Sequence, residues 1–163
     1  MVSLTRERRR SAPPRPGLAP TPFTAAEIRA GCPAGRVSIV RTSDGIGSTR
    51  FAAVDDDGAW IEDTPLDGNG EAAGPVERER STWHELQEHA AFPAADTTID
   101  RAELTGPLGT LSCLRYTVRR DAAELVFWFA VDFPGMPIRV ERTENGMTRV
   151  TLEVVAISGV PER

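Results

Sequence analysis

The chain has 163 residues, a formal net charge of -5 and an apolar fraction of 40%. This length suits one domain with its own hydrophobic core, and the slight acidity argues against general affinity for nucleic acid or anionic membranes. No apolar run approaches the roughly 20 residues that a spanning helix needs, so we expect no transmembrane segment.

Residues 1–22 are rich in Arg, Ser and Pro and offer a core almost nothing to bury. This composition predicts a disordered tail ahead of a single β-rich domain over residues 23–160. A secretory signal needs an apolar stretch, which five prolines between residues 13 and 22 interrupt. Glu27 and Arg29 interrupt the stretch that a lipoprotein site at Cys32 would need. We therefore expect a cytoplasmic protein.

Two short helices are expected, each opened by a Thr and a Glu three residues later, which satisfy each other's free backbone N–H groups. The first begins after Thr24 and ends at Gly31, before a proline. The second begins after Thr82 and runs over residues 83 to about 91. Helical spacing places Trp83 on its apolar face, so this helix should pack against the rest of the domain.

Outside the helices, apolar and polar residues alternate over about nine short segments. Turn sequences such as Asp57-Gly58 and Asn145-Gly146 separate them. Because these strands are neighbours in sequence and are joined by tight turns, they should form an antiparallel meander. Residues 76–79 have charged neighbours, which predicts a strand at an edge of the sheet.

Residues 125–131, LVFWFAV, are apolar at every position. Neither face of such a strand can lie in water without cost, so it should be central and covered on both sides. In the preceding segment, residues 110–120, the apolar residues change from odd to even positions after Cys113, which predicts a bulge there.

The expected fold is therefore α+β and mainly β. We predict a strongly curved antiparallel meander sheet, a half-barrel of about nine strands, with two short helices. The second helix should cover the sheet.

The segment His84-Glu85-Leu86-Gln87-Glu88-His89 comes close to a zinc-protease helix, which needs two histidines four residues apart. Here they are five apart and about 140° apart around a helix, too divergent to hold one ion. We expect ion pairs one turn apart instead, His84 with Glu88 and Glu85 with His89. The sequence therefore predicts no metal site.

Other chemistry-bearing residues also favour structural roles. Residues 55–57 before Gly58 read as an acidic turn, because a calcium loop placed there would lack acidic residues at both ends. Cys32 and Cys113 are expected to be free thiols, and a bridge between them remains open only for an exported protein. No nucleophile elbow, phosphate-binding loop or dinucleotide fingerprint occurs, so we expect neither an enzyme nor a cofactor.

Residues 127–141 form a strand, a Pro-Gly-x-Pro turn and a second strand, an arrangement that resembles lipoprotein carriers of the LolA and LppX type. Gly31-Cys32-Pro33, the Trp83 helix ending in Phe92-Pro93, and Cys113-x-x-Tyr116 are similar to motifs of an uncharacterised family of small bacterial proteins. The carrier resemblance implies a curved sheet that holds a lipid under helical lids.

The expected function is therefore non-catalytic binding of an apolar small molecule or lipid between sheet and helix. Aromatic and apolar residues are the candidates for lining the site: Trp60, Trp83, Tyr116, Trp128, Phe133 and Met136. The same side chains could instead fill the core. The alternative function is a protein-interaction module that pairs with a partner, or with a second copy, through an edge strand at residues 76–79 or the last strand.

Overall fold

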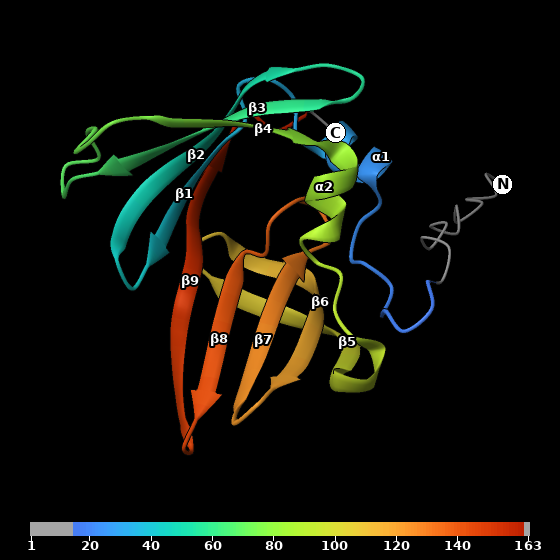
Figure 1. Ribbon diagram of the computed structural model, residues 1–163. Coiled ribbons are helices and arrows are strands. Elements are labelled where there is room, and N and C mark those ends of the chain that lie inside the picture. Colours follow the sequence, from blue (N-terminus) through green and yellow to red (C-terminus); the bar gives the residue numbers. More distant parts are fainter. Residues whose placement is uncertain (1–14, 162–163) are drawn as a thin grey trace, which may run out of the picture.

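The computed structural model describes residues 15–161. In this part of the chain, nine antiparallel strands form one sheet in the order β4-β3-β2-β1-β9-β8-β7-β6-β5. The sheet is strongly curved and not closed, so the predicted half-barrel is confirmed (Figure 1). The elements are α1 (Ala25–Gly31), β1 (Val37–Thr42), β2 (Gly45–Val54), β3 (Gly58–Leu66), β4 (Glu77–Thr82), α2 (Trp83–Glu88), the 3-10 helix η1 (Ala94–Asp96), β5 (Thr97–Gly106), β6 (Gly109–Arg120), β7 (Ala123–Ala130), β8 (Arg139–Glu144) and β9 (Met147–Ser158).

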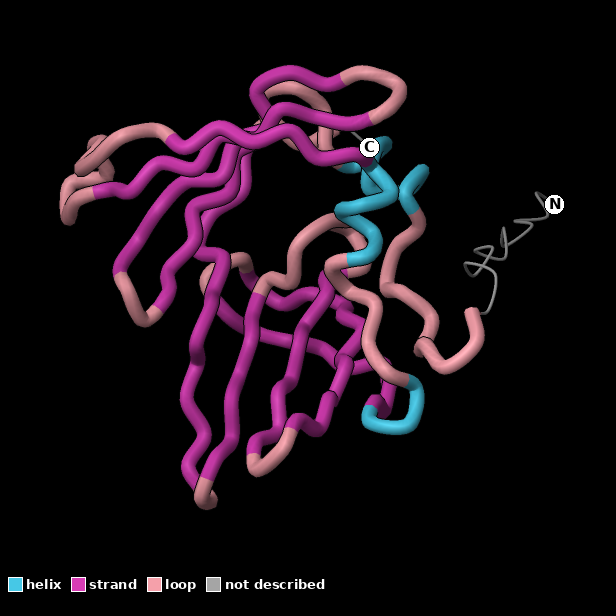
Figure 2. The backbone as a smooth tube through the Cα atoms, viewed as in Figure 1, coloured by secondary structure: helices cyan, strands magenta, loops and turns pink. Residues whose placement is uncertain are grey.

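The strands do not follow sequence order across the whole sheet. β1 to β4 form one meander and β5 to β9 a second, and pairing of β1 with β9 joins them. The edges are therefore β4 and β5, which are consecutive in sequence, and the segment between them runs past one side of the curved sheet (Figure 2). The edge predicted at residues 76–79 is confirmed by β4. The prediction that the last strand forms an edge was wrong, because β9 lies between β1 and β8.

Both helices begin as predicted. Thr24 and Thr82 are N-caps, and each takes part in a capping box with the Glu three residues on. α2 ends at Glu88, three residues earlier than expected. Among the described residues, no helix has the length and apolar character needed to cross a membrane.

The acidic turn between β2 and β3 holds the start of α2. The Asp55 carboxylate accepts hydrogen bonds from the backbone N–H groups of Asp57 (2.8 Å) and Gly58 (3.0 Å), which fixes the turn. The Asp55 carbonyl accepts a bond from the Trp83 indole at 2.9 Å, and the Asp57 carbonyl accepts one from the Trp83 backbone at 3.1 Å. The indole also stacks against Phe51 on β2, so α2 covers the sheet as predicted.

Two hydrophobic clusters lie on opposite faces of β7. Phe129 belongs to the first, which the helices cover, and Trp128 to the second, against which the apolar residues of the β5–β6 hairpin pack. The strand is thus covered on both sides, as its uniformly apolar sequence predicted. The bulge expected at Cys113 is absent, because β6 pairs with both neighbours without a register shift. Cys113 faces the second cluster and Tyr116 the first, which explains the change of parity.

The ordered domain begins before the predicted boundary at residue 23. Leu18 forms a bridge with Pro93, and the Ala19 N–H donates to the Phe92 carbonyl at 2.8 Å. The Tyr116 hydroxyl donates to the Pro20 carbonyl at 2.6 Å. Residues 15–22 therefore pack on the domain, whereas residues 1–14 of the predicted tail lie outside the described residues.

Gly58 gives a test of the contact between β3 and β4. A Cβ at this position would clash with the Ser81 carbonyl oxygen and lie 2.8 Å from the Thr82 Cα. We expect Gly58→Ala to lower the free energy of unfolding by about 1–3 kcal/mol, because backbone atoms must shift. Denaturant unfolding would measure the loss. The control is Gly68→Ala, where a Cβ meets nothing within 4 Å; an equal loss in both variants would contradict the close packing.

Candidate ligand-binding cavity

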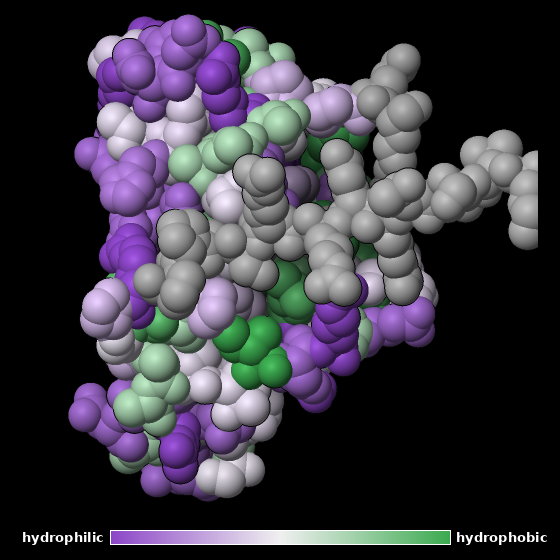
Figure 3. Space-filling view, turned by 90° about the vertical axis from the view of Figure 1, so that its right-hand side faces the viewer, coloured by the Kyte–Doolittle hydropathy of each residue, from purple (hydrophilic) through white to green (hydrophobic). Residues whose placement is uncertain are grey.

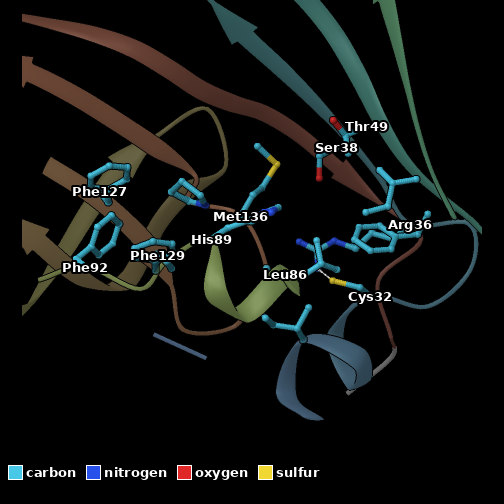
Figure 4. Close-up of a pocket in the computed structure, with 16 residues that line it drawn as sticks. Cys32, Arg36, Ser38, Thr49, Leu86, His89, Phe92, Phe127, Phe129 and Met136 are labelled. Atoms are coloured by element: carbon cyan, nitrogen blue, oxygen red, sulfur yellow. Dashed lines mark hydrogen bonds between the residues drawn. The ribbon is translucent and has the colours of Figure 1, made fainter. Parts of the chain in front are cut away.

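A cavity of about 210 Å³ lies between the two helices and the sheet, beside the loop that joins β7 to β8 (Figure 4). Its walls come from α1, α2 and the inward side chains of strands on both halves of the sheet. Most of these walls are apolar, and they include Ile28, Phe51, Leu86, Phe92, Phe129 and Met136. The cavity is therefore continuous with the first hydrophobic cluster.

One end of the cavity is polar, and its main feature is Arg36, which is only 3% exposed. The Nη1 atom of Arg36 donates to two carbonyls, those of Gly31 (2.9 Å) and Pro134 (2.5 Å), and contacts the Cys32 sulfur at 2.9 Å. These contacts join the end of α1 to the β7–β8 loop. Nη1 is thus fully used by the protein.

The other two nitrogens of the Arg36 guanidinium, Nε and Nη2, make no hydrogen bond within residues 15–161. Arg36 Nε is buried and has no hydrogen-bond partner among the residues that the structure describes. Within residues 15–161, no hydrogen bond reaches Nη2 and no carboxylate pairs with Arg36. Burying a charged group without a counter-ion is costly, and these two nitrogens form the edge of the guanidinium that binds a carboxylate side-on.

Backbone pairing fixes the place of Arg36. The Gly35 N–H donates to the Phe51 carbonyl at 2.7 Å, and the Phe51 N–H donates to the Arg36 carbonyl at 2.9 Å, which continues the β1–β2 ladder beyond β1. Side chains two residues apart share a face, so Ser38 follows Arg36 into the cavity wall and is 5% exposed.

Ser38 and its cross-strand neighbour Thr49 differ in orientation. The Thr49 hydroxyl donates to the Asp63 carboxylate at 2.7 Å. Figure 4 shows the Ser38 hydroxyl turned toward the interior of the cavity and that of Thr49 turned away from it. Ser38 is thus the hydroxyl that can serve a bound molecule.

Cys32 lies beside Arg36 and is completely buried. Burial raises the pKa of the Cys32 thiol above its ordinary value, and this outweighs the opposite influence of the Arg36 charge and hydrogen bond. Burial also raises the pKa of the Cys113 thiol. Both cysteines are free, as predicted. Cys32 is therefore a neutral thiol, not the thiolate that nucleophilic attack or metal binding needs.

The two histidines are placed differently. His89 lines the cavity and is exposed. His84 forms the pair with Glu88 that their spacing predicted, with 3.6 Å between His84 Nε2 and Glu88 Oε1. The expected side-chain pair of Glu85 with His89 does not form, because the Glu85 carboxylate accepts from the Thr82 N–H in the helix cap. Among the described residues, no group of three or more potential ligands could hold a metal ion.

Of the six residues predicted to line a site, Met136 lines the cavity. Trp83 and Tyr116 are buried in the first cluster, and Trp128 and Phe133 pack in the second. Trp60 is 37% exposed on β3, where the Arg78 guanidinium covers its ring at 4.7 Å. Five of the six candidates therefore have packing or surface roles.

The polar end of the cavity was not predicted. The sequence shows apolar residues on both faces of β1, with Val37 and Ile39 on one face and Val40 on the other. The structure buries Ser38 and Val40 instead, with Arg36 on the same side just before the strand. The available signal was the alternation Arg36-x-Ser38-x-Val40, a basic and a hydroxyl residue leading into a strand.

No protein-family model matches the chain, and no curated protein matches it. Among solved structures, the hypothetical protein CT021 from Chlamydia trachomatis is similar, with 10% sequence identity and a TM-score of 0.45. The match covers 86% of this chain and 98% of the other.

Tyr116 should make stability depend on alkaline pH. Burial raises the pKa of its hydroxyl from 10.0 to about 12. Because the folded-state pKa lies above the unfolded one, the stabilisation is complete below pH 10 and is lost as the pH rises toward 12. We expect the free energy of unfolding to fall by on the order of 2 kcal/mol in this range, measured by denaturant unfolding at a series of pH values.

The control is Tyr116→Phe, which keeps the ring in the core and removes the titrating hydroxyl. This variant should be less stable at neutral pH, and its free energy of unfolding should fall less between pH 10 and 12. A decline that is equally steep in both proteins would show that Tyr116 is not its source. The cysteines remain in both, so their contribution cancels in the comparison.

Proposed function

We propose that the protein is a non-catalytic binding protein that holds a small apolar molecule between the curved sheet and α2. The observation that carries this proposal is the cavity of about 210 Å³, whose walls are mostly apolar and which has the buried polar side chains of Arg36 and Ser38 at one end. Small-molecule sites are typically concave and apolar, with a few polar groups that orient the ligand.

The volume limits the size of the ligand. Pockets for drug-sized molecules usually measure about 300–1,000 Å³, whereas an apolar cavity of about 150 Å³ can hold benzene. The cavity here, at about 210 Å³, suits a molecule with one ring or an aliphatic body of similar size. A small molecule therefore fits better than the acyl chains of a lipid.

The resemblance to lipoprotein carriers agrees with this proposal in its general arrangement only. A curved sheet with a helix over its inner side is the arrangement in which such carriers hold an apolar ligand. In this chain the loop between β7 and β8, which carries that resemblance, supplies Gly135 and Met136 to the cavity wall. The proposal therefore keeps the binding principle and replaces the lipid with a smaller ligand.

The chemistry of the cavity supports binding without catalysis. Cys32 is held as a neutral thiol, and among the described residues no histidine or carboxylate hydrogen-bonds its sulfur. Within the same part of the chain no base accepts a hydrogen bond from the Ser38 hydroxyl. An activated nucleophile would need such a partner within about 3 Å.

The edge strands give weaker support to the alternative, an interaction module or homodimer. β4 carries Glu77, Arg78, Glu79 and Arg80 in succession, and charges of this kind discourage pairing with another strand. On the side of the molecule that holds the helices and β5, Figure 3 shows apolar residues in scattered patches among polar ones, outside the part drawn in grey. Binding in the cavity is therefore the stronger proposal.

Toluene is a suitable probe of this proposal. At a free concentration 100 times Kd it should stabilise the protein by about 2.7 kcal/mol, seen as a rise in Tm. Ala90→Leu places extra carbon atoms in the cavity wall and should weaken toluene binding about tenfold or more. Ala26→Leu adds the same atoms at an exposed position of α1 and should bind as the wild type does.

Two results would overturn the proposal. One is the absence of any toluene-induced shift in Tm up to the solubility limit of toluene. The other is an equal shift in the wild type and in Ala90→Leu, which would place the bound toluene elsewhere.

A further inference from the structure

We infer that the ligand is a monocarboxylic acid, with an apolar body about the size of one ring, whose carboxylate binds the free edge of Arg36. This inference rests on the proposed function and adds the chemical class of the ligand. It starts from Arg36 itself, which lines the cavity and has only 3% of its surface exposed.

The described part of the chain leaves the charge of Arg36 without a counter-ion. Nη1 has three acceptors, but two are neutral carbonyls and the third, Cys32, is a neutral thiol. Within residues 15–161, no carboxylate pairs with the guanidinium. Removing an unpaired charge from water is costly, so an anion that enters the cavity would regain part of that energy.

The free atoms of Arg36 match a carboxylate in geometry. Among residues 15–161 neither Nε nor Nη2 has a hydrogen-bond partner, and their N–H vectors are parallel on one edge of the guanidinium. Nε is covered by neighbouring atoms, so a carboxylate would meet Nη2 first and reach Nε after a small shift of the side chain. A planar carboxylate accepts two such bonds at once. The Ser38 hydroxyl, on the same face and turned into the cavity, can donate a third bond.

A purely structural role for Arg36 explains less. Nη1 alone makes the contacts that tie α1 to the Pro134 loop. A lysine would supply those donors from a single nitrogen, without burying Nε unpaired. A planar guanidinium can bond the protein through Nη1 and still offer Nε and Nη2 to a ligand.

The charge balance favours a carboxylate over a phosphate monoester. Arg36 is the one buried cation in the described cavity wall, and His89 lies at its exposed rim. One cation neutralises a singly charged carboxylate, whereas a dianion would keep an uncompensated charge among Ile28, Leu86 and Phe129. Those apolar side chains suit the body of the acid instead.

The first test uses the wild-type protein and three probes of one size, measured by isothermal titration calorimetry: benzoate, benzamide and toluene. Benzamide has the shape of benzoate without its charge. We expect benzoate to bind at least about tenfold more tightly than benzamide, because only the anion offers two charged acceptors to Arg36. Equal affinity for benzoate and benzamide would overturn the inference.

The second test uses variants of the guanidinium. Arg36→Gln should remove the preference for benzoate, and Arg36→Lys should keep part of it, because a lysine keeps the charge but loses the side-on pair of donors. Toluene binding and Tm report whether each variant still has a formed cavity. Arg50→Gln is the matched control: it removes one positive charge from the exposed neighbour of Val37 on β2 and should leave the benzoate preference intact.

The outcomes separate this inference from the proposed function. If toluene binds and benzoate binds no better than benzamide, the cavity is a binding site but Arg36 does not select the ligand. If none of the three probes binds the wild-type protein, the proposed function itself fails. If Arg36→Gln does not fold, the comparison of benzoate with benzamide in the wild type still decides the matter, and Arg36→Lys supplies the variant.

Discussion

The architecture depends on one constraint of chain connectivity: the two edge strands, β4 and β5, are joined by residues 83–96 alone. Even if residues 89–93 were fully extended, α2, these five residues and η1 together would reach about 32 Å at most. A flat sheet of nine strands would separate its edges by about 38 Å. The sheet must therefore curl, and the short connection is what holds the half-barrel in its bent form.

The same connection creates the cavity. Trp83 at its start is fixed to the Asp55 turn, and Phe92 near its end packs against Tyr116 and Phe127. Between these two anchors α2 lies over the inner side of the sheet and faces residues of both meanders across the cavity. Space remains beneath it because Leu86 on α2 and Ala90 in the turn that follows are too small to fill the interval.

The sequence was informative where local chemistry decides structure. Thr24 and Thr82 identified both helix starts, and the uniformly apolar residues 125–131 identified the strand covered on both sides. It was less informative where distant segments meet. The β1–β9 pairing, which places β9 inside the sheet, joins residues more than a hundred positions apart, and no turn signal encodes it. Aromatic content pointed to Trp128, but tertiary packing placed that ring in the second cluster and Arg36 in the cavity.

The attachment of α2 at both ends has a kinetic consequence. A flap with one hinge can swing open, but α2 is a strut between opposite edges of the sheet, and Gln87 also binds it to the Ala25 backbone and the Thr21 hydroxyl. Moving α2 away from the sheet would break the contact of Trp83 with the Asp55 turn and part of the first cluster at the same time. His89 is the exposed residue of the cavity wall, so for the proposed ligand we expect small rotations of side chains at this rim, rather than a domain movement, to set the residence time.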